Sequence, residues 1–513
     1  MHAPNGMVCS VDHLASEAGV ALLRAGGSAA DAAIAASAVL AVTTQHMCGM
    51  GGDLFALVHD RTGAPAALVA AGRAGSGADA AALRAEGHRA IPAHGDVRAA
   101  TVPGCVDGWL ALHQRYGRAP LADVLAPAET YARDGFPASP ILARSAPLVA
   151  GVAGAEDYPT DGSLRAGDRV QRPTVAALLS VVASGDRDVF YQGAFGDGLV
   201  QLGAGLYSPA DLEVSLAEWT EPLHLDAWGH ELWTVPPPSQ GYLTLAAAWI
   251  ADGLDLPTDP DDAGWAHLLA EAARQAGYDR PDVLHEDADG SALLHPDRLR
   301  PRRDAIDPGL RGAGGAPSRA GDTIYLCAVD GDGMGVSLIQ SNAAGWGCHL
   351  VVPGTGVFLH NRGIGFSLEA GHPAELAPGR RPPHTLAPAL VTRDGALHAV
   401  VGTMGGDTQP QVVLQLLARL LPGHQSPGTA VRSPRWALGG GGFDVWDDDD
   451  PATTIEWDAP ASWETGLAAR GHRVERAPRG ANLGHAHVIV RAPDGMLAGA
   501  ADPRALSGAA TGW

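Results

Sequence analysis

The apolar residues near the N-terminus follow the spacing of helices, interrupted by glycine. Residues 11–25 place apolar side chains on one helix face: Leu14, Ala18, Leu22 and Leu23. Gly26 and Gly27 end this predicted helix, and Ser28 can cap a second helix over residues 29–42. The small side chains of that second helix would let another layer of structure approach closely, which predicts a buried helix.

Further along the chain, the pattern changes between strand and helix. Residues 54–59 (LFALVH) follow a glycine-rich loop and alternate as a half-buried strand would. Residues 105–135 are typical of two helices separated by Gly117 and Pro120, and another helix is expected over residues 264–278.

The sharpest change in pattern lies near residue 322. Residues 309–321 (GLRGAGGAPSRAG) are rich in glycine, alanine and proline and offer little that could pack, so we expect a flexible segment. Residues 323–329 and 335–340 then have the pattern of two strands joined by a turn, which predicts a hairpin. Composition alone fits both a domain boundary and a processing site at this position.

The overall composition supports a large core and excludes two kinds of partner. Of 513 residues, 46% are hydrophobic and 18% are charged, so the chain can bury a sizeable core. The formal net charge of −22 repels nucleic acid and anionic membranes, and we expect neither as a partner. The acidic tract at residues 446–451 (WDDDDP) is expected to be a solvated loop.

Cysteine usage and the termini bear on location. The five cysteines include no C-x-x-C pair, which argues against a disulfide framework and against a structural zinc site. The N-terminus lacks the basic stretch and apolar core of a signal peptide, and no apolar run is long enough to span a bilayer. We therefore expect a cytoplasmic protein.

Six stretches, in order along the chain, resemble the gamma-glutamyltransferase family. They are residues 22–60, 102–137, 235–245 (VPPPSQGYLTL), 321–368, 377–395 (APGRRPPHTLAPALVTRDG) and 402–417 (GTMGGDTQPQVVLQLL). Each stretch alone is a weak signal. Because the six occur in family order and cover nearly the whole chain, chance similarity is a poor explanation.

This resemblance implies a fold and a maturation step. The fold is α+β, a four-layer αββα sandwich of the N-terminal nucleophile hydrolase type. The maturation step is self-cleavage between Asp322 and Thr323 into a large subunit, 1–322, and a small subunit, 323–513, which stay associated. Such heterodimers could assemble further into a homo-oligomer. The family usually has a threonine and a histidine after the nucleophile, where this chain has Ile324 and Tyr325.

The matching nucleophile is Thr323, and its chemistry explains why cleavage is needed. A threonine hydroxyl requires a base beside it at neutral pH. An N-terminal threonine has one in its own α-amine, whose ordinary pKa is about 7.7–8.0. Before cleavage the nitrogen of Thr323 belongs to the peptide bond with Asp322, so the precursor should be inactive. Without the resemblance, Thr323 would be read as an ordinary first residue of a strand.

The resemblance assigns roles to further residues. Ser341, 18 residues after Thr323, matches a threonine that hydrogen-bonds the nucleophile. Gly405 and Gly406 match a diglycine whose N–H groups bind the oxyanion of acyl transfer. Arg73 matches the arginine that grips the substrate's carboxylate, a task that suits its bidentate fork. By themselves these residues would be a surface serine, a turn and a surface ion pair.

Four further positions depart from classical gamma-glutamyl enzymes. Gly365 stands where an aspartate is expected to bind the donor's α-amino group, and Arg362 replaces a nearby glutamine. His384 and Thr385 replace the paired serines of the carboxylate pocket. A pocket that loses an acid and gains an arginine should favour a small amide with a carboxylate, as in the branch that includes oxamate amidohydrolase. The replacements are also compatible with a neutral effect.

Alternatives remain open. Gamma-glutamyl transfer or glutathione hydrolysis is the second candidate activity, and a catalytically dead family member that binds a small acid is the third. His46, His360, His485 and His487 lack metal-site spacing and are interpreted as ordinary polar residues. No phosphate-binding glycine loop of the Rossmann or Walker type is present in the sequence, so we expect catalysis without a metal or a nucleotide cofactor.

Overall fold

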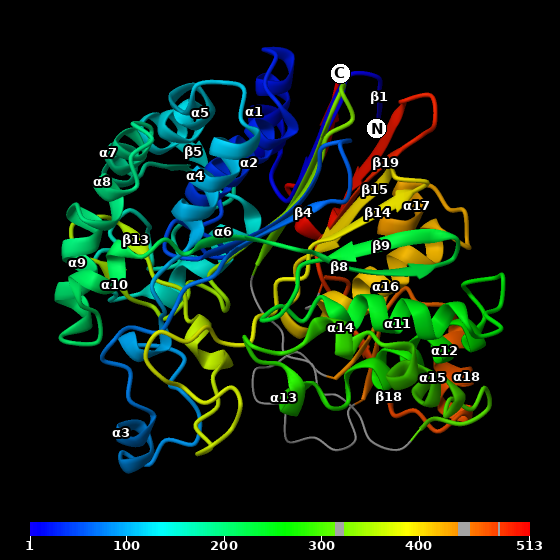
Figure 1. Ribbon diagram of the computed structural model, residues 1–513. Coiled ribbons are helices and arrows are strands. Elements are labelled where there is room, and N and C mark those ends of the chain that lie inside the picture. Colours follow the sequence, from blue (N-terminus) through cyan, green and yellow to red (C-terminus); the bar gives the residue numbers. More distant parts are fainter. Residues whose placement is uncertain (313–322, 440–451, 481–482) are drawn as a thin grey trace.

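Two antiparallel sheets of seven strands each lie face to face at the centre of the protein (Figure 1). The computed structural model describes residues 1–312, 323–439, 452–480 and 483–513. Sheet A has the strand order β1 (His2–Ala3), β20 (Leu497–Ala501), β19 (Ala486–Arg491), β15 (Ala396–Thr403), β14 (Ala389–Arg393), β9 (His230–Thr234) and β8 (Leu223–Ala227). Sheet B has the order β21 (Ala509–Gly512), β2 (Gly6–Ser10), β10 (Ile324–Asp330), β11 (Gly335–Ser341), β3 (Asp53–His59), β4 (Ala66–Ala70) and β7 (Ala217–Thr220).

Helices cover the outer face of each sheet (Figure 1). Sheet B carries α1 (His13–Arg24), α2 (Ala29–Thr43) and α4 (Cys105–Tyr116), with α5 (Leu121–Asp134) and α7 (Pro173–Val182) outside them. Sheet A carries α11 (Tyr242–Asp252), α16 (Gln409–Leu420) and α17 (Pro427–Arg432), with α12 (Ala263–Gly277), α15 (Pro296–Asp304) and α18 (Ala461–Ala469) outside them. The short helix α13 (Arg280–Val283) and the 3-10 turn η3 (Arg362–Gly365) lie near the site described below.

Three hydrophobic clusters hold these layers together. The cluster between the two sheets contains Phe55, Trp233, Tyr325, Val400 and Ile489. The other two lie between each sheet and its own helices. A helix layer, two stacked sheets and a second helix layer make the predicted four-layer αββα sandwich, so the predicted α+β class is confirmed.

The alanine-rich helix α2 is buried along its entire length, as predicted. Its small side chains let α1, α5 and the strands of sheet B approach from several sides. Ser28 caps it through a reciprocal pair: Ser28 Oγ accepts from Asp31 N at 3.1 Å, and Asp31 Oδ2 accepts from Ser28 N at 2.8 Å. Helices α1, α4, α5 and α12 also lie where the pattern predicts them.

Strand β3 differs from its prediction. The alternation over residues 54–59 predicted a half-buried strand, but all seven residues of β3 are buried. One face points into the core between the sheets, and the other packs against helix α4. A strand covered on both faces does not need polar residues on either.

Strands β10 and β11 form the predicted hairpin, with Ile324 opposite Gln340. Residues 309–312, the start of the segment predicted to be flexible, are held by hydrogen bonds, two of which reach distant parts of the chain. Arg311 N donates to Arg470 O at 2.8 Å, and Gly312 N donates to Glu271 Oε2 at 3.0 Å. Asp322 and the acidic tract at 446–451 lie outside the described residues. Within the described ranges, no helix is both long and apolar enough to cross a membrane.

Candidate active site

The hairpin brings Thr323 and Ser341 together. Thr323 directly precedes β10, Ser341 ends β11, and the pairing of Ile324 with Gln340 sets them side by side. Thr323 Oγ1 lies 2.8 Å from Ser341 Oγ, and both residues are fully buried. Two residues predicted to act together are therefore in hydrogen-bonding contact.

Ile324 and Tyr325, which depart from the family pattern, serve packing. Ile324 belongs to the cluster under the helices, and Tyr325 lies in the core between the sheets. Tyr325 Oη is 3.1 Å from Ser337 Oγ. Neither side chain lines the cavity described below.

Arg362 is the cation nearest to this hydroxyl pair among the described residues. Its Nη2 donates to Ser341 Oγ at 3.3 Å, and its Nη1 donates to Thr385 Oγ1 at 3.0 Å. The main-chain N–H of Ala343 also donates to Ser341 Oγ, at 2.8 Å. Two N–H groups therefore donate to the Ser341 hydroxyl that contacts Thr323 Oγ1.

The carboxylates of the described residues neutralise the charge of Arg362 only partly. The residue is buried, and its nearest carboxylate in the described ranges is Asp53, whose Oδ2 lies 4.0 Å from Nε. Burial lowers the pKa of Arg362 to about 10, against the raising effect of Asp53 and Asp407. The guanidinium is still charged at neutral pH, so an anion bound beside it would be stabilised.

Asp53 is the centre of a buried cluster that sequence reasoning missed. Its Oδ2 lies 3.2 Å from His360 Nδ1 and 3.0 Å from His384 Nε2, while Oδ1 accepts from Gly72 N at 2.9 Å. Burial would raise the pKa of Asp53, but the two histidines outweigh it and hold that pKa far below its ordinary value. Burial and the nearby Arg362 lower the pKa of His384 to about 3, so its imidazole is neutral at pH 7.

Gly405 and Gly406 adopt backbone conformations that favour glycine. Their φ angles are +134° and +56°, in the region where a Cβ atom is strained. A Cβ on Gly405 would also lie 2.6 Å from Thr408 Oγ1. The sequence signal of a functional diglycine therefore coincides with a turn that requires glycine.

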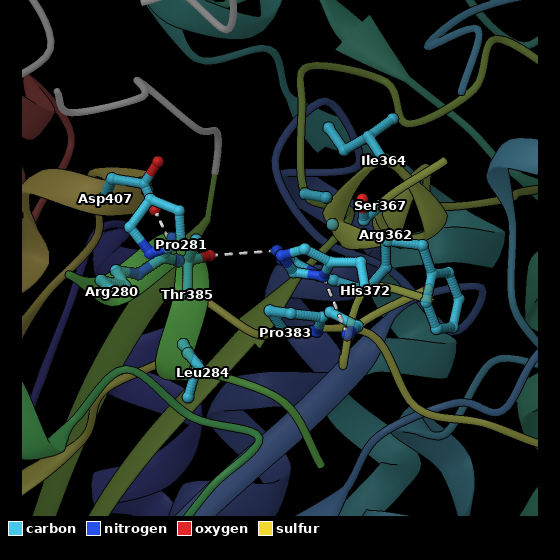
Figure 2. A pocket seen from close by; sticks show the side chains of 15 residues that line it. Arg280, Pro281, Leu284, Arg362, Ile364, Ser367, His372, Pro383, Thr385 and Asp407 are labelled. Carbon is cyan, nitrogen blue, oxygen red and sulfur yellow. Dashed lines mark hydrogen bonds and ion pairs between the residues drawn. The ribbon is translucent and has the colours of Figure 1, made fainter. Parts of the chain in front are cut away.

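A cavity of about 210 Å³ opens beside these groups (Figure 2). Arg280, Arg362 and Asp407 are its charged wall residues apart from histidine, and its apolar wall includes Leu284, Ile364 and Phe366. Thr385, Gly365 and Gly406 also line it. Figure 2 shows Asp407, Arg280 and Thr385 on one side and Ile364, Ser367 and His372 on the other. Arg280 Nη2 donates to Asp407 Oδ1 at 2.9 Å.

The predicted catalytic residues Thr323, Ser341 and Gly405 are not wall residues of this cavity, which approaches them through Arg362 and Gly406. Two predicted substrate-binding residues also lie outside its wall. Arg73 Nη1 donates to Gly379 O at 2.9 Å and contacts Glu286 Oε2 at 3.3 Å, and its side chain is 35% exposed. His384 points toward Asp53, so only Thr385 of the His384–Thr385 pair lines the cavity. Arg280 is a wall residue that the sequence gave no reason to select, because it comes from a short helix outside every recognised motif.

The histidines singled out in the sequence lie in buried surroundings. His46, His485 and His487 have pKa values lowered by burial to about 3, about 4 and about 3. Within the described part of the chain, the group that could offer three metal ligands is His267, Glu271 and His472. His267 Nδ1 and His472 Nε2 are 2.8 Å apart. Two nitrogens on one tetrahedral zinc would be about 3.3 Å apart, so this contact is a hydrogen bond.

The sequence profile of the gamma-glutamyltranspeptidase family matches residues 15–512. This protein belongs to the gamma-glutamyltranspeptidase family. Among curated relatives, it is 37% identical to the oxamate amidohydrolase proenzyme of Klebsiella pneumoniae, with 100% of both chains covered. It is 34% identical to a glutathione hydrolase-like proenzyme of Bacillus subtilis, covering 99% of this chain and 98% of that one.

A solved structure agrees with this assignment. The fold matches the cephalosporin acylase from Bacillus halodurans with a TM-score of 0.91 and 32% identity, covering 100% of this chain and 96% of that one. The prediction of an enzyme, an amide hydrolase of the N-terminal nucleophile type made as a proenzyme, is confirmed by membership of this family.

Proposed function

We propose that this protein cuts itself between Asp322 and Thr323 and then hydrolyses a small amide that carries a carboxylate close to its carbonyl. One observation carries the substrate class. The buried guanidinium of Arg362 lies 3.3 Å from Ser341 Oγ, which is 2.8 Å from Thr323 Oγ1. A carboxylate bound by Arg362 would hold the adjacent carbonyl within reach of the nucleophile. Oxamate, H2N–CO–COO⁻, is the smallest amide of this kind.

Maturation begins with the hydroxyl of Thr323. Its Oγ1 attacks the carbonyl carbon of Asp322, and the peptide nitrogen leaves, so the peptide bond becomes an ester. The departing nitrogen takes up a proton and becomes the free α-amine of Thr323. Water then hydrolyses the ester, which releases the carboxyl group of Asp322 and restores the Thr323 hydroxyl. The Ser341 hydroxyl, which contacts Oγ1, is in position to orient it during the attack.

Hydrolysis of the substrate uses the freed amine as the base. The α-amine accepts the proton of Oγ1, which attacks the amide carbonyl. The N–H groups of Gly405 and Gly406 stabilise the resulting oxyanion. The amine then gives the proton to the leaving nitrogen, and ammonia departs. Water attacks the threonine ester in the same way and releases the carboxylic acid.

The strand order supports two subunits that stay together after the cut. Strand β10, which follows Thr323, lies between β2 of the large subunit and β11 of the small subunit. Sheet A likewise pairs β9 of the large subunit with β14 of the small one. Separating the subunits would break both sheets.

Classical gamma-glutamyl activity is the second candidate. It needs an acid to hold an α-ammonium group, and Asp407 does line the cavity. That carboxylate binds Arg280 at 2.9 Å, and Gly365 offers no side chain. A buried ammonium without a partner is costly, so a gamma-glutamyl donor should be the poorer substrate.

The test compares two donors on processed enzyme: oxamate, followed by ammonia release, and a gamma-glutamyl anilide, followed by aniline release. We expect the higher kcat/KM with oxamate. The double variant Gly365→Asp with Arg362→Gln should move preference back toward the anilide. A Cβ at Gly365 would lie 2.6 Å from Pro383 O, so the backbone at Pro383 must shift to admit the aspartate. Ordinary efficiency with the anilide and none with oxamate would reject the proposed substrate class in favour of the classical activity.

Thr323→Ala tests the nucleophile and separates an enzyme from a dead relative. It removes the attacking oxygen of both reactions, so the variant should remain a single 52.5 kDa chain with no hydrolysis. Thr323→Ser should keep part of both functions. Wild-type protein should give two bands on a denaturing gel, and normal processing of Thr323→Ala would place the nucleophile elsewhere.

A further inference from the structure

We infer that Gln240 is a positioning residue that fixes the diglycine turn from across the cleavage site. The inference rests on the proposed function, in which Gly405 and Gly406 bind the oxyanion. Gln240 lies in the loop between β9 and α11, and its side chain is fully buried. It therefore belongs to the proposed large subunit, whereas the turn belongs to the small one.

The side-chain amide of Gln240 joins two walls of the cavity. Its Nε2 donates to Gly406 O at 2.9 Å and to Thr385 O at 3.0 Å. Gly406 and Thr385 both line the cavity but come from separate loops. Both acceptors are carbonyl oxygens, so only a group with two N–H donors can serve them together.

Peptide planarity determines which bonds orient the two proposed oxyanion donors, the N–H groups of Gly405 and Gly406. In a trans peptide the C=O and the next residue's N–H point in opposite directions, so fixing one fixes the other. Met404 O accepts from Thr403 Oγ1 at 2.7 Å, and Gly405 O accepts from Thr408 Oγ1 at 2.7 Å. These two bonds orient the N–H groups of Gly405 and Gly406.

Gln240 acts on the next peptide, which joins Gly406 O to the N–H of Asp407. Gly406 O also accepts from Gln409 N within the turn, and Gln240 Nε2 holds it from outside. When the peptide planes on both sides of Gly406 are held, its φ and ψ angles are fixed, and so is the direction of its N–H. A diglycine has no side chains to stop its peptide planes from rotating, so an outside clamp has the most effect there. The two threonines come from the same stretch of chain as the turn, and Gln240 is the clamp from a distant segment. Loss of the clamp should change the orientation of the oxyanion donors more than the binding of the substrate's carboxylate.

The base of the clamp is itself fixed. Gln240 N donates to His384 O at 2.9 Å, and Ser239 Oγ donates to Leu386 O at 2.6 Å. Gly241 N donates to Ser239 Oγ at 2.9 Å. Because its backbone is held on both sides, Gln240 of the large subunit can fix the position of Gly406 O in the small subunit.

The experiment uses Gln240→Glu, which keeps the shape and removes both N–H donors. An ionised carboxylate would face two carbonyl oxygens, so kcat should fall about tenfold to a hundredfold with little change in KM. Burial raises the pKa of such a carboxyl, and the protonated form regains one donor. The ratio of variant to wild-type kcat should therefore rise as pH falls from 8 to 5.

Gln415→Glu is the matched control. Gln415 is also buried, and its Nε2 donates to two main-chain carbonyls, Gln411 O at 3.0 Å and Trp436 O at 2.9 Å. It lies on α16 away from the cavity wall. The control should lose stability without a pH-dependent kcat ratio. Gln240→Met, which removes the donors without adding charge, covers the case in which Gln240→Glu does not fold.

A second readout separates this inference from the substrate proposal. The rate at which a sulfonyl fluoride labels Thr323, followed by intact mass, needs no amide substrate. Slower labelling in both Gln240 variants supports the clamp even if oxamate is not hydrolysed. Two results would overturn the clamp whatever the substrate. One is an unchanged labelling rate and an unchanged kcat in Gln240→Met. The other is a ratio of variant to wild-type kcat that does not change with pH in Gln240→Glu and equals the ratio for Gln415→Glu.

Discussion

Two buried arginine clusters in this protein differ in how completely their charge is neutralised. Arg504 Nε lies 2.6 Å from Glu456 Oε1, and its Nη1 lies 3.1 Å from Asp502 Oδ1. Asp502 also binds Arg435 Nη2 at 2.7 Å, so two arginines face two carboxylates. Arg362 has Asp53 at 4.0 Å, and that carboxylate is shared with two histidines.

The pKa values of the two arginines follow this difference. Burial lowers the pKa of Arg504, but its bonds to Glu456 and Asp502 outweigh that and raise it above the ordinary value. Burial lowers the pKa of Arg362 to about 10, because its partners offset less. A buried cation that the protein itself satisfies supports the fold, and one left partly unsatisfied beside a cavity is prepared for an anion.

The largest expected effect is on stability, from Arg504→Met. It leaves Glu456 buried without its cation, which should reduce the free energy of unfolding by about 3–5 kcal/mol. Urea unfolding of the uncut Thr323→Ala chain would measure it. Pairing Arg504→Met with Glu456→Gln should recover much of the loss, and an equal loss in the double variant would reject the charge argument.

Arg362→Gln should differ from Arg504→Met: it should lower activity strongly and change the free energy of unfolding only a little. Loss of one charged contact to the substrate should lower kcat/KM for oxamate about a hundredfold, or about 2.7 kcal/mol. Arg362→Lys should recover part of this, because it keeps the charge without the fork. An unfolding loss as large as that of Arg504→Met would remove the distinction between the clusters.

The smallest effect concerns His384 and pH. Its folded pKa of about 3 lies below the ordinary 6.5, so between these values the unfolded chain binds a proton that the folded protein does not. Stability should therefore fall as pH falls below 6.5, by about 1.4 kcal/mol per pH unit from this group. In the uncut chain, the free energy of unfolding of His384→Gln should change less steeply with pH between pH 6 and 4, by about 1.4 kcal/mol per pH unit. Parallel curves would contradict a neutral buried His384.

Local patterns predicted much of the fold. Helix α2 and the hairpin of β10 and β11 were readable because small residues and a turn leave clear local signals. The burial of both faces of β3 was not, because the second covering layer comes from helix α4, about 50 residues away in the chain.

The site was predictable where a motif carried it and not where the fold assembled it. Family resemblance singled out Thr323 and Ser341, and the predicted hairpin between them accounts for their contact. Asp53 meets His360 and His384 only after more than 300 residues of chain have folded, and nothing local marks that meeting. Arg280 reaches the cavity from outside any motif. Such contacts are set by tertiary structure alone.

Because strands of both proposed subunits alternate within each sheet, the cut and the uncut protein should differ in how they recover from unfolding. An uncut chain that unfolds can refold by itself, since all strands of both sheets are on one polymer. Once cut before Thr323, the same strands belong to two molecules, and reassembly becomes a bimolecular event that dilution slows. Maturation would then exchange a reversible equilibrium for a kinetic one, in which the rate of opening decides how long the enzyme survives.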